Sequence, residues 1–410
     1  MHILLIHQAF AALDEPGGTR HFELAQHLAQ RGHRVTVIAS QVSYLTGKTR
    51  GKSLSWVEAQ SYGEAISVLR AYTYPAIHRS FVHRVFSFFS FMFSSFFIGW
   101  SVREVDMVWG TSPPIFQGVT AWLLARLKGV PFLFEVRDLW PAFAVAVGVL
   151  RNPFLIWVSE GLERFLYRRA GTVVVNSPGF VEHVRGREGR LVELVPNGAD
   201  TTMFHPEYKG MDFRRAHGLE GKIVVLYAGA HGMSNDLGVV LEAAEKLRNQ
   251  PEIQFVLLGD GKEKSSLMER AQQMGLENLH FLPPVSKVTM PQVLGAADIC
   301  VGILRPIPLY ATVYPNKIFD YLAAGRPIVL AMEGVIREVV EAARAGIPVS
   351  PGDATSLAEA VRILACDAQL RIEMGQRGRR YVEKHFERTR LAEKFADVCE
   401  RLIAEVDGGL

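Results

Sequence analysis

Two series of short apolar runs, separated by segments of helical periodicity, constrain the fold of this chain more than any other feature. The first series consists of HILLIH, VTVIAS, VDMVWG, PFLFEV and TVVVNS, and the second of KIVVLYAG, IQFVLLGDG, LHFL, DICVGIL and PIVLAM. Short apolar runs that alternate with helices are typical of strands in a parallel sheet that is covered on both faces. The sequence therefore predicts two doubly wound α/β domains.

The length of the chain and its turn residues indicate where the domains meet. A chain of 410 residues is too long for one ordinary domain. The turn Pro196–Gly198 follows the last run of the first series. We therefore expect an N-terminal domain at 1–200, a C-terminal domain at 201–385 and a last helix at 386–410. Phe395, Val398 and Leu402 give that helix an apolar face, which we expect to pack back on the N-terminal domain.

Charge, cysteine usage and the first residues exclude several classes of protein. The formal net charge of +3 is small for this length, so we expect no nucleic-acid partner. Three cysteines without a C-x-x-C spacing fit a reducing compartment and exclude a zinc site built from cysteines. The start MHILLIHQAF predicts a strand and lacks the features of a signal peptide, so we expect a cytoplasmic protein.

The sequence also lacks common arrangements of metal ligands. It contains no Asp-x-Asp pair and no His-x-x-x-His pair. We therefore expect neither a metal site nor a resident cofactor.

The segment 78–103 departs from the α/β pattern because it is crowded with aromatic residues. Eight of the 24 phenylalanines lie at positions 81–97, and Arg79, Arg84 and Arg103 flank them. The apolar stretch 85–100 is shorter than the roughly 20 residues that a spanning helix needs, and serines at 87, 90 and 94 recur at helical spacing. The composition favours a helix that lies on a membrane surface. The alternative is a helix buried between the sheet and another part of the protein.

The stretch TVYPNKIFDYLAAGRPIV, residues 312–329, predicts a helix with an anion site at its start. Ile318, Tyr321 and Leu322 recur at helical spacing, which leaves Lys317 and Asp320 on a different part of the helix surface. Pro315 suits the loop before the helix, and Gly325 and Pro327 end it. The first turn of a helix presents free backbone N–H groups, and Lys317 adds a positive charge there.

Two glycine pairs follow predicted strands and allow a ligand to approach the backbone. Gly17 and Gly18 precede the first helix, and Gly229 and Gly232 follow the first strand of the second domain. Neither pair matches G-x-G-x-x-G, and a plain tight turn explains the first pair about as well as a ligand does. Ligands of such domains bind beyond the carboxyl ends of the parallel strands.

Several of these segments resemble a known family. VPNGADTTMF, YAG, PNKIFDYLAAGRPIV and EGVIREVV resemble the retaining glycosyltransferases of family 4, and the likeness covers nearly the whole chain. FEVRDLWPAFAVAVGVL is similar to a segment of the bacterial L-fucosamine-transferase-like branch, which builds surface polysaccharides on lipid carriers. The resemblance implies the GT-B fold, two Rossmann-like domains that face a cleft. It also implies a nucleotide-sugar donor on the second domain and an acceptor on the first.

The carboxylate pair of the family is only partly present in this chain. The family has two glutamates eight positions apart before Ala-x-Gly-x-Pro; the second corresponds to Asp320 and the first to Thr312. The resemblance therefore implies that Asp320 binds the ribose of the donor, together with the neighbouring Asn316 at the start of the helix.

The charged residues that hold the donor diphosphate in the family are also replaced. They correspond to Ala230 and Asn235, which are uncharged. We therefore expect Lys317, with Arg305 in reserve, to stabilise the diphosphate, and Gly229 and Gly18 to contact the donor.

The acceptor side is assigned to the first domain. A histidine of the family corresponds to Arg137, and we expect Arg137 and Gly17 to contact the acceptor. Asp138 is a candidate for positioning the acceptor hydroxyl and is one of two candidate catalytic residues, with Lys317 the other. The alternative for Asp138 is that it caps a helix beginning near Trp140.

The expected activity is retaining, metal-independent transfer of a sugar of the N-acetylhexosamine type. A UDP-sugar is the expected donor, and the acceptor is a lipid-linked glycan of surface polysaccharide synthesis (O-antigen or capsule) at the inner face of the cell membrane. Two alternatives remain. A sugar-nucleotide epimerase of the same fold would act on a soluble substrate and would not need the aromatic segment. A membrane scaffold without activity is suggested by the uncharged positions 230, 235 and 312.

Overall fold

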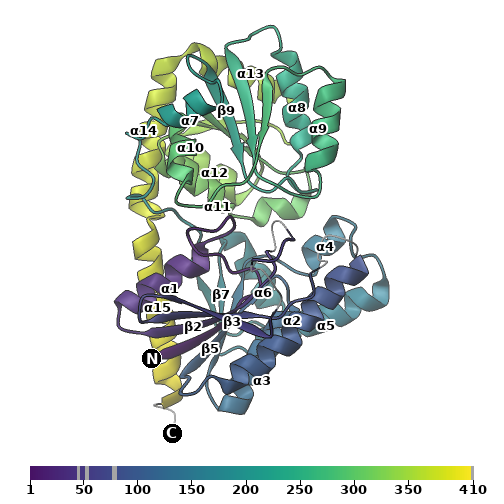
Figure 1. The fold of residues 1–410 in the computed structure, drawn as a ribbon, viewed down its shortest axis with the longest axis vertical. Coiled ribbons are helices and arrows are strands. Elements are labelled where there is room, and N and C mark those ends of the chain that lie inside the picture. Colours follow the sequence, from purple (N-terminus) through teal and green to yellow (C-terminus); the bar gives the residue numbers. More distant parts are fainter. Residues whose placement is uncertain (44–46, 51–54, 76–80, 408–410) are drawn as a thin grey trace. The chain divides into compact units, whose positions relative to one another are not determined.

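The computed structural model describes residues 1–43, 47–50, 55–75 and 81–407 and divides the chain into two compact units (Figure 1). Unit 1 comprises residues 1–12, 17–196 and 389–410, and unit 2 comprises residues 13–16 and 197–388. The main crossing therefore lies within the turn Pro196–Gly198, a few residues before the expected position of 200. The expected boundaries also left out residues 13–16, which lie with unit 2 although they precede the first helix.

Unit 1 is built on an eight-stranded sheet in the order β3-β4-β2-β1-β5-β6-β7-β8. Its strands are β1 His2–Ile6, β2 Arg34–Ser40, β3 Val57–Tyr62, β4 Ile66–Ala71, β5 Met107–Ser112, β6 Phe132–Val136, β7 Thr172–Val175 and β8 Val192–Leu194. The five predicted runs form β1, β2, β5, β6 and β7, and they are buried along almost their whole length. Continuous burial explains why these strands are apolar without alternation.

One strand of unit 1 departs from the predicted parallel sheet. β3 pairs antiparallel with β4 at the edge of the sheet, and the two strands form a hairpin. β3 has the sequence VEAQSY and is mostly exposed, so it carries no apolar run that would reveal a strand. A hairpin at a sheet edge needs only one buried face, which explains why the sequence pattern did not indicate it.

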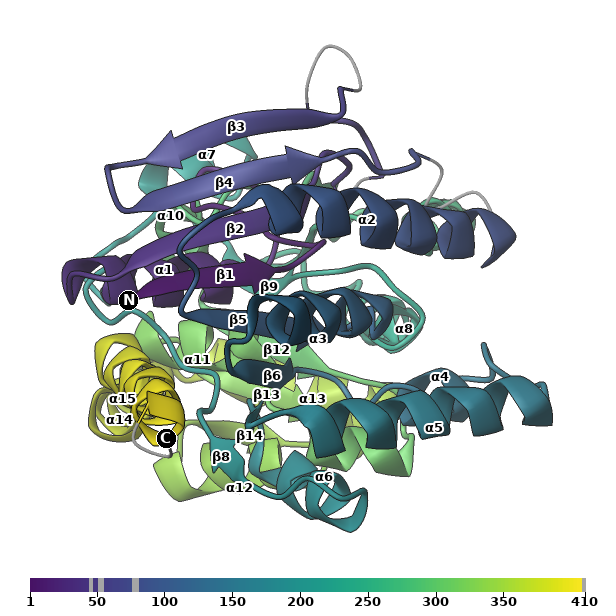
Figure 2. The ribbon, with the colours of Figure 1, turned by 90° about the horizontal axis from the view of Figure 1, so that it is seen from below.

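Helices cover both faces of the sheet of unit 1. Figure 2 shows α2, α3 and α5 side by side on one face and α1 and α15 on the other. The helices are α1 Arg20–Gln30, α2 Phe81–Ser101, α3 Phe116–Lys128, α4 Ala142–Ala146, α5 Pro153–Arg169, α6 Val181–Gly186 and α15 Arg388–Asp407, with a 3-10 turn, η1, at Pro178–Phe180. α15 packs on unit 1 through Phe395, whose ring centroid lies 4.5 Å from that of Trp109.

Helix α2 buries several serines and leaves a stripe of aromatic rings exposed, although Phe91 is buried. Ser87 and Ser94 are fully buried, and the Ser94 hydroxyl donates to the carbonyl of Tyr72 at 2.7 Å. The large exposed side chains on the helix are Val82, Phe86, Phe89, Phe93, Phe97 and Trp100. An exposed stripe of rings is the reverse of an ordinary surface helix, in which the apolar face points to the core.

The helix Phe81–Ser101 lies within the expected segment 78–103 and extends beyond the apolar stretch 85–100 at both ends. By length and composition, Val82–Ser101 could cross a membrane, and 33% of the tested window is buried in the protein. The prediction that this segment is too short to span was therefore wrong, because helical structure includes the residues on both sides of the apolar stretch. Arg79, which was expected to flank the helix, lies outside the described residues.

Unit 2 is a six-stranded parallel sheet in the order β11-β10-β9-β12-β13-β14. The strands are β9 Ile223–Ala228, β10 Ile253–Leu258, β11 Leu279–Leu282, β12 Ile299–Ile303, β13 Ile328–Ala331 and β14 Gly346–Pro348. The helices are α7 Met211–Ala216, α8 Leu237–Lys246, α9 Lys264–Gln273, α10 Met290–Ala296, α11 Asn316–Ala323, α12 Val335–Ala343, α13 Ala354–Cys366 and α14 Ala368–His385, with a 3-10 turn, η2, at Pro308–Thr312.

Two buried clusters lie on the two faces of this sheet. Val224 and Leu226 of β9 point into a cluster with α11, α12 and α14, whereas Val225 and Tyr227 point into a cluster with α8 and α13. Alternate residues of one strand therefore serve opposite cores, as the period of two requires. Each unit is a doubly wound α/β domain, as the sequence predicted.

Candidate functional site

The sheet of unit 2 contains a switch point between β9 and β12, where the order of the strands changes direction. β9 pairs with β10 on one side and with β12 on the other, and both pairings are parallel. Gly229 directly follows β9, and Arg305 comes two residues after β12. Ligands of open α/β sheets bind beyond the carboxyl ends of the strands at such a point. Two of the predicted donor residues therefore lie where a nucleotide is expected.

Lys317, in the first turn of α11, lies against the end of β9. Its ammonium donates a hydrogen bond to the Tyr227 hydroxyl at 2.8 Å and lies 3.9 Å from the centre of the Tyr227 ring. The Tyr227 hydroxyl in turn donates to the carbonyl of Ala230 at 2.8 Å. Tyr321, one turn further along α11, accepts the Ala228 N–H at 2.9 Å and thereby fixes the helix against the same strand.

Lys317 has no acidic partner among the described residues. Burial lowers the pKa of its ammonium to about 7, because removal from water disfavours the charged form. An anion placed next to this group would restore the charge and raise the pKa. The start of α11 adds the partial positive charge of its free backbone N–H groups. The arrangement suits a phosphate.

The loop after β9 approaches Lys317 too closely for a side chain at position 229. Gly229 has a φ of +153°, and a Cβ built on it would lie 2.6 Å from the Lys317 nitrogen. His231 in the same loop is fully buried, and burial lowers the pKa of its imidazole to about 4. His231 is therefore neutral near pH 7, and it does not replace the cations that the loop lacks at Ala230 and Asn235.

Asp320 does not lie on the helix surface, contrary to the prediction. Its side chain is buried, and one carboxylate oxygen accepts from the Lys287 ammonium at 2.7 Å and from the Asn316 side-chain amide at 3.2 Å. Lys287 is also buried and lies 4.7 Å from the centre of the Phe204 ring. The reason for the burial is that the loop after β11 covers this side of α11. Asp320 therefore belongs to an internal ion pair in this structure.

Asn316 links the start of α11 to the end of unit 2. Its side-chain oxygen accepts from Arg388 at 2.9 Å, and its amide nitrogen donates to Asp320. Asn316 therefore orients the Asp320 carboxylate, and contact between Asn316 and the donor stays a prediction.

Arg305 lies beside the loop after β9, which is the position expected for a second cation that contacts the donor diphosphate. Its backbone N–H donates to the carbonyl of Ser234 at 2.9 Å. Its guanidinium is partly exposed and lies 3.4 Å from the Glu263 carboxylate. Because Glu263 already faces it, Arg305 carries less unbalanced charge than Lys317 does.

The predicted site residues of unit 1 lie in two loops, one before α1 and one after β6. Gly17 and Gly18 are exposed in the loop before α1, and Gly17 has a φ of +150°. Arg137 and Asp138 directly follow β6. Arg137 donates to the Thr111 hydroxyl at 2.9 Å and to the carbonyl of Pro113 at 3.1 Å, so its guanidinium braces the loop after β5. Contact of these residues with a donor or an acceptor stays a prediction.

Asp138 does not cap a helix near Trp140. α4 begins at Ala142, with Pro141 preceding it, and no side chain caps its first turn. Burial raises the pKa of the Asp138 carboxyl to about 7, although the nearby Arg137 acts in the opposite direction. A carboxyl group with this pKa exchanges a proton near neutral pH, which suits a residue that positions a hydroxyl.

Sequence analysis missed a buried charged cluster in unit 1. Glu135 on β6 is fully buried, with its two oxygens 2.9 Å from Arg20 and 2.7 Å from His21. Burial alone would raise the pKa of the Glu135 carboxyl, but His21 and Arg20 hold it below its ordinary value. Arg20 also donates to the carbonyls of Val195 and Pro196. The cluster therefore connects α1 and β6 to Val195 and Pro196, where the chain first leaves unit 1. The signal in the sequence was Glu135, a charged residue inside the apolar run PFLFEV, because a carboxylate on a buried strand needs a charged or hydrogen-bonding partner.

Comparison with solved structures assigns this fold to a class. The chain superimposes on sucrose-phosphate synthase from Thermosynechococcus elongatus with a TM-score of 0.79 at 19% identity, covering 98% of this chain and 99% of that one. It superimposes on Anabaena HepE in complex with UDP-glucose with a TM-score of 0.70 at 16% identity, covering 98% and 100%. At these identities the likeness shows the fold, and the protein has the GT-B fold of glycosyltransferases.

Two domain families match the sequence itself. The family described as "Glycosyl transferase 4-like domain" matches residues 17–198, and "Glycosyl transferases group 1" matches residues 222–367. WcaI of Escherichia coli strain K12, named as a colanic acid biosynthesis glycosyl transferase, is 27% identical over 321 residues, which are 76% of this chain and 78% of WcaI. The protein is therefore a glycosyltransferase, with a 4-like domain followed by a group 1 domain.

Proposed function

We propose that this glycosyltransferase transfers a sugar from a UDP-linked donor to a lipid-linked acceptor during synthesis of a bacterial surface polysaccharide. The named role of WcaI supports a polysaccharide product, and the complex of HepE with UDP-glucose supports a UDP-sugar donor. The transferred sugar is of the N-acetylhexosamine type. The enzyme acts at the inner face of the cell membrane and retains the configuration of the anomeric carbon.

The observation that carries the proposal is the partly buried ammonium of Lys317, which has no acidic partner among the described residues. The bond between the anomeric carbon and the diphosphate oxygen breaks during transfer, and negative charge grows on the diphosphate. A cation next to that oxygen stabilises the transition state more than the ground state. The acceptor oxygen forms the new bond on the same face of the sugar, and its proton passes to the departing diphosphate. Neither step calls for a metal ion.

The exposed rings of α2 support a membrane location. Phe86 and Phe93 are 60% and 61% exposed, which is unusual for large apolar side chains of a protein that stays in water. Arg84 and Arg103 lie at the two ends of the helix, where they suit anionic headgroups. Docking on the membrane would bring the enzyme to a lipid-linked acceptor.

Replacement of Lys317 by Met tests the proposal. We expect kcat for transfer from a UDP-sugar to fall by about 100-fold or more, with a much smaller change in the Kd for UDP. Lys262→Met is the matched control, because Lys262 is an exposed lysine of the same unit. A thermal-shift screen over UDP, GDP, ADP and dTDP sugars comes first and identifies the donor.

Three results would contradict the proposal. Full activity of Lys317→Met would show that the Lys317 ammonium does not stabilise the leaving diphosphate. A rise in melting temperature with GDP-, ADP- or dTDP-sugars, and none with UDP-sugars, would contradict the proposed UDP-linked donor. A product with inverted anomeric configuration, seen by NMR, would remove the retaining mechanism.

A further inference from the structure

Helices α4 and α5 carry a second group of exposed apolar side chains, apart from α2 in the sequence. Phe154 and Trp157 at the start of α5 are 66% and 67% exposed, and their ring centroids lie 6.1 Å apart. Leu155 and Val158 on α5 are also exposed, and so is Val145 on α4. Sequence analysis assigned no role to them. Exposed aromatic pairs of this size mark an interaction surface.

Helix α3 connects this group to the aromatic stripe of α2. α3 lies between α2 and α5 on one face of the sheet (Figure 2). Its Phe116 ring lies 5.3 Å from Phe89 of α2, and its Trp122 ring lies 4.7 Å from Phe165 of α5. More than half of the exposed large apolar side chains among the described residues lie between Val82 and Val158. Exposed large apolar side chains therefore occur along α2, at Leu127 near the end of α3 and at the start of α5.

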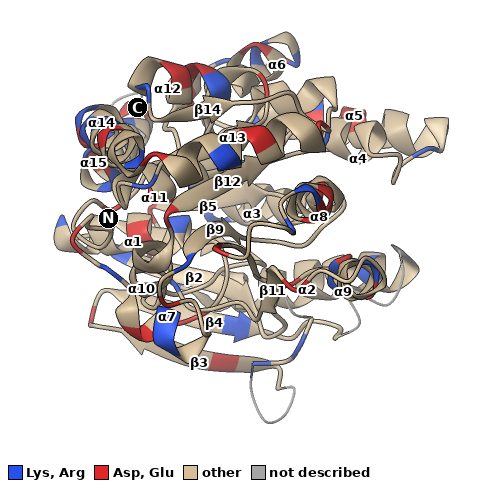
Figure 3. Ribbon diagram, turned by 90° about the horizontal axis from the view of Figure 1, so that it is seen from above, with Lys and Arg blue, Asp and Glu red and all other residues tan. Residues whose placement is uncertain are grey.

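The same surface lacks negative charge. The sequence has no Asp or Glu at 65–103, at 107–134 or at 139–159, which include all of α2, α3 and α4 and the exposed start of α5. In Figure 3 the ribbon of α4 and the adjoining end of α5 is largely tan. Arg126 and Arg151 are exposed on α3 and before α5. A surface of rings with cations and without carboxylates is complementary to an anionic lipid bilayer.

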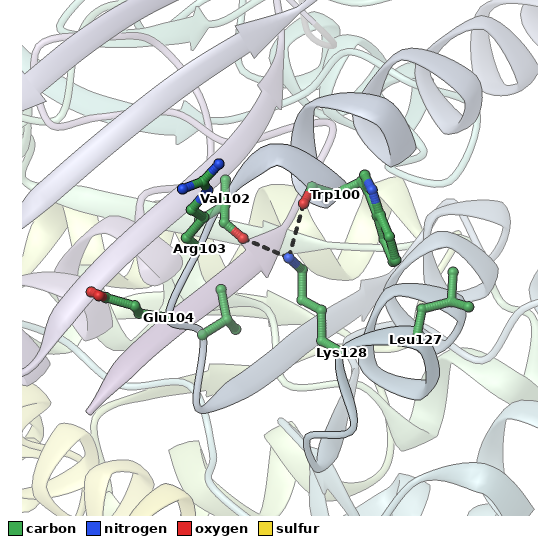
Figure 4. A pocket seen from close by; sticks show the side chains of 7 residues that line it. Trp100, Val102, Arg103, Glu104, Leu127 and Lys128 are labelled. Atoms are coloured by element: carbon green, nitrogen blue, oxygen red, sulfur yellow. Dashed lines mark hydrogen bonds between the residues drawn. The ribbon is translucent and has the colours of Figure 1, made fainter.

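A hollow at the end of α2 adds further cations to this surface. It has a volume of about 430 Å³, and Trp100, Leu127, Arg103, Glu104 and Lys128 are among its lining residues, so two cations and one exposed carboxylate lie at this edge of the surface (Figure 4). The Lys128 ammonium donates to the carbonyls of Trp100 and Val102, and the Arg103 side chain is exposed. An arginine beside a tryptophan at the edge of an apolar surface suits the headgroup region of a bilayer.

We propose that α4 and the start of α5 form a second membrane-insertion point, so that the layer α2–α3–α5 lies on an anionic bilayer at two places. This inference rests on the proposed membrane location, and it adds a second contact between unit 1 and the bilayer. Two separated insertion points fix the orientation of unit 1 on the membrane, whereas a single helix would leave it free to rotate about that helix.

Fluorescent probes at single cysteines test the two insertion points separately. Cys366 is exposed and is replaced by Ser, whereas Cys300 and Cys399 are buried. An environment-sensitive fluorophore is then attached at Trp157→Cys, at Phe93→Cys or at the control Met268→Cys on α9 of unit 2, where the native side chain is 47% exposed. The probes are read with vesicles of phosphatidylcholine, with and without phosphatidylglycerol. We expect the emission at 157 and 93 to shift to shorter wavelength on phosphatidylglycerol vesicles, and the emission at 268 to stay unchanged.

The outcomes separate this inference from the proposed function. A shift at 93 without a shift at 157 would overturn the second insertion point and leave the membrane location intact. No shift at either position would overturn both. Phe154→Ser with Trp157→Ser should lower the partition coefficient on these vesicles by about tenfold or more, while Met268→Ser with Ile372→Ser leaves it unchanged. If the α5 variant instead abolishes a dimer and keeps vesicle binding, the surface contacts a second copy and the inference is wrong.

Discussion

Replacement of Asp320 by Ala should affect both stability and nucleotide binding, because the carboxylate has an internal partner. Asp320 is 8% exposed and Lys287 is 9% exposed, and the two charged atoms lie 2.7 Å apart. Removal of one member of a buried pair leaves the other charge without its partner, at a cost of about 3–5 kcal/mol. For a unit of this size the melting temperature should fall on the order of 10 °C.

The effect on nucleotide binding adds to this structural cost. If Asp320 accepts hydrogen bonds from the ribose hydroxyls, each bond to the charged group contributes about 1.5–3 kcal/mol. The Kd for UDP should then rise by about tenfold to a hundredfold or more. Calorimetry with UDP on wild type and Asp320→Ala measures this change directly, at a temperature at which circular dichroism shows both proteins folded.

Lys287→Met is the variant that separates the two effects. It breaks the same ion pair and should lower the melting temperature by a similar amount, but it keeps the carboxylate. We expect its affinity for UDP to fall less than that of Asp320→Ala. Equal affinities for UDP in folded wild type and Asp320→Ala would refute the ribose contact, and Asp320 would then have a structural role alone, as the partner of Lys287 and Asn316.

Three further predictions concern Lys317 and the metal requirement. The pKa of Lys317 is about 7 in the folded protein and 10.5 in an ordinary lysine, so the unfolded state binds more protons between pH 7 and 10.5. The free energy of unfolding of wild type relative to Lys317→Met should therefore rise with pH across that window, and denaturant titrations that show a constant difference would contradict this. Gly229→Ala should weaken UDP binding several-fold because its methyl group would displace the Lys317 ammonium, whereas Gly232→Ala, whose Cβ would meet only Asn235 at 3.8 Å, serves as the control. Activity should persist in EDTA, since Lys317 is assigned to the leaving diphosphate; loss of turnover that magnesium or manganese restores would show a metal requirement.

Much of the fold could be predicted from the sequence because its determinants are local. A buried parallel strand is a continuous apolar run, so ten of the fourteen strands in the described part of the chain correspond to the two predicted series. The start of α11 and its lysine could be predicted for the same reason, since Pro315, the apolar spacing and Gly325 lie within eleven residues. The edge strand β3 could not be predicted, because an exposed edge strand needs no apolar pattern.

The tertiary structure decided which groups each side chain contacts. Asp320 is buried because Lys287, 33 positions earlier, lies against it. Ser90 and Ser94 of α2 face the segment at Tyr72 and Tyr74 and form hydrogen bonds with its backbone, and the exposed rings lie on the other side of the helix. Periodicity along a sequence shows that a helix has two faces, but which face is buried depends on groups that come together only in the folded chain. The positions of most strands along the chain and the cation at the start of α11 were therefore determined locally, whereas the order of the strands in each sheet, the ion pair and the exposed aromatic surface depend on contacts between distant segments.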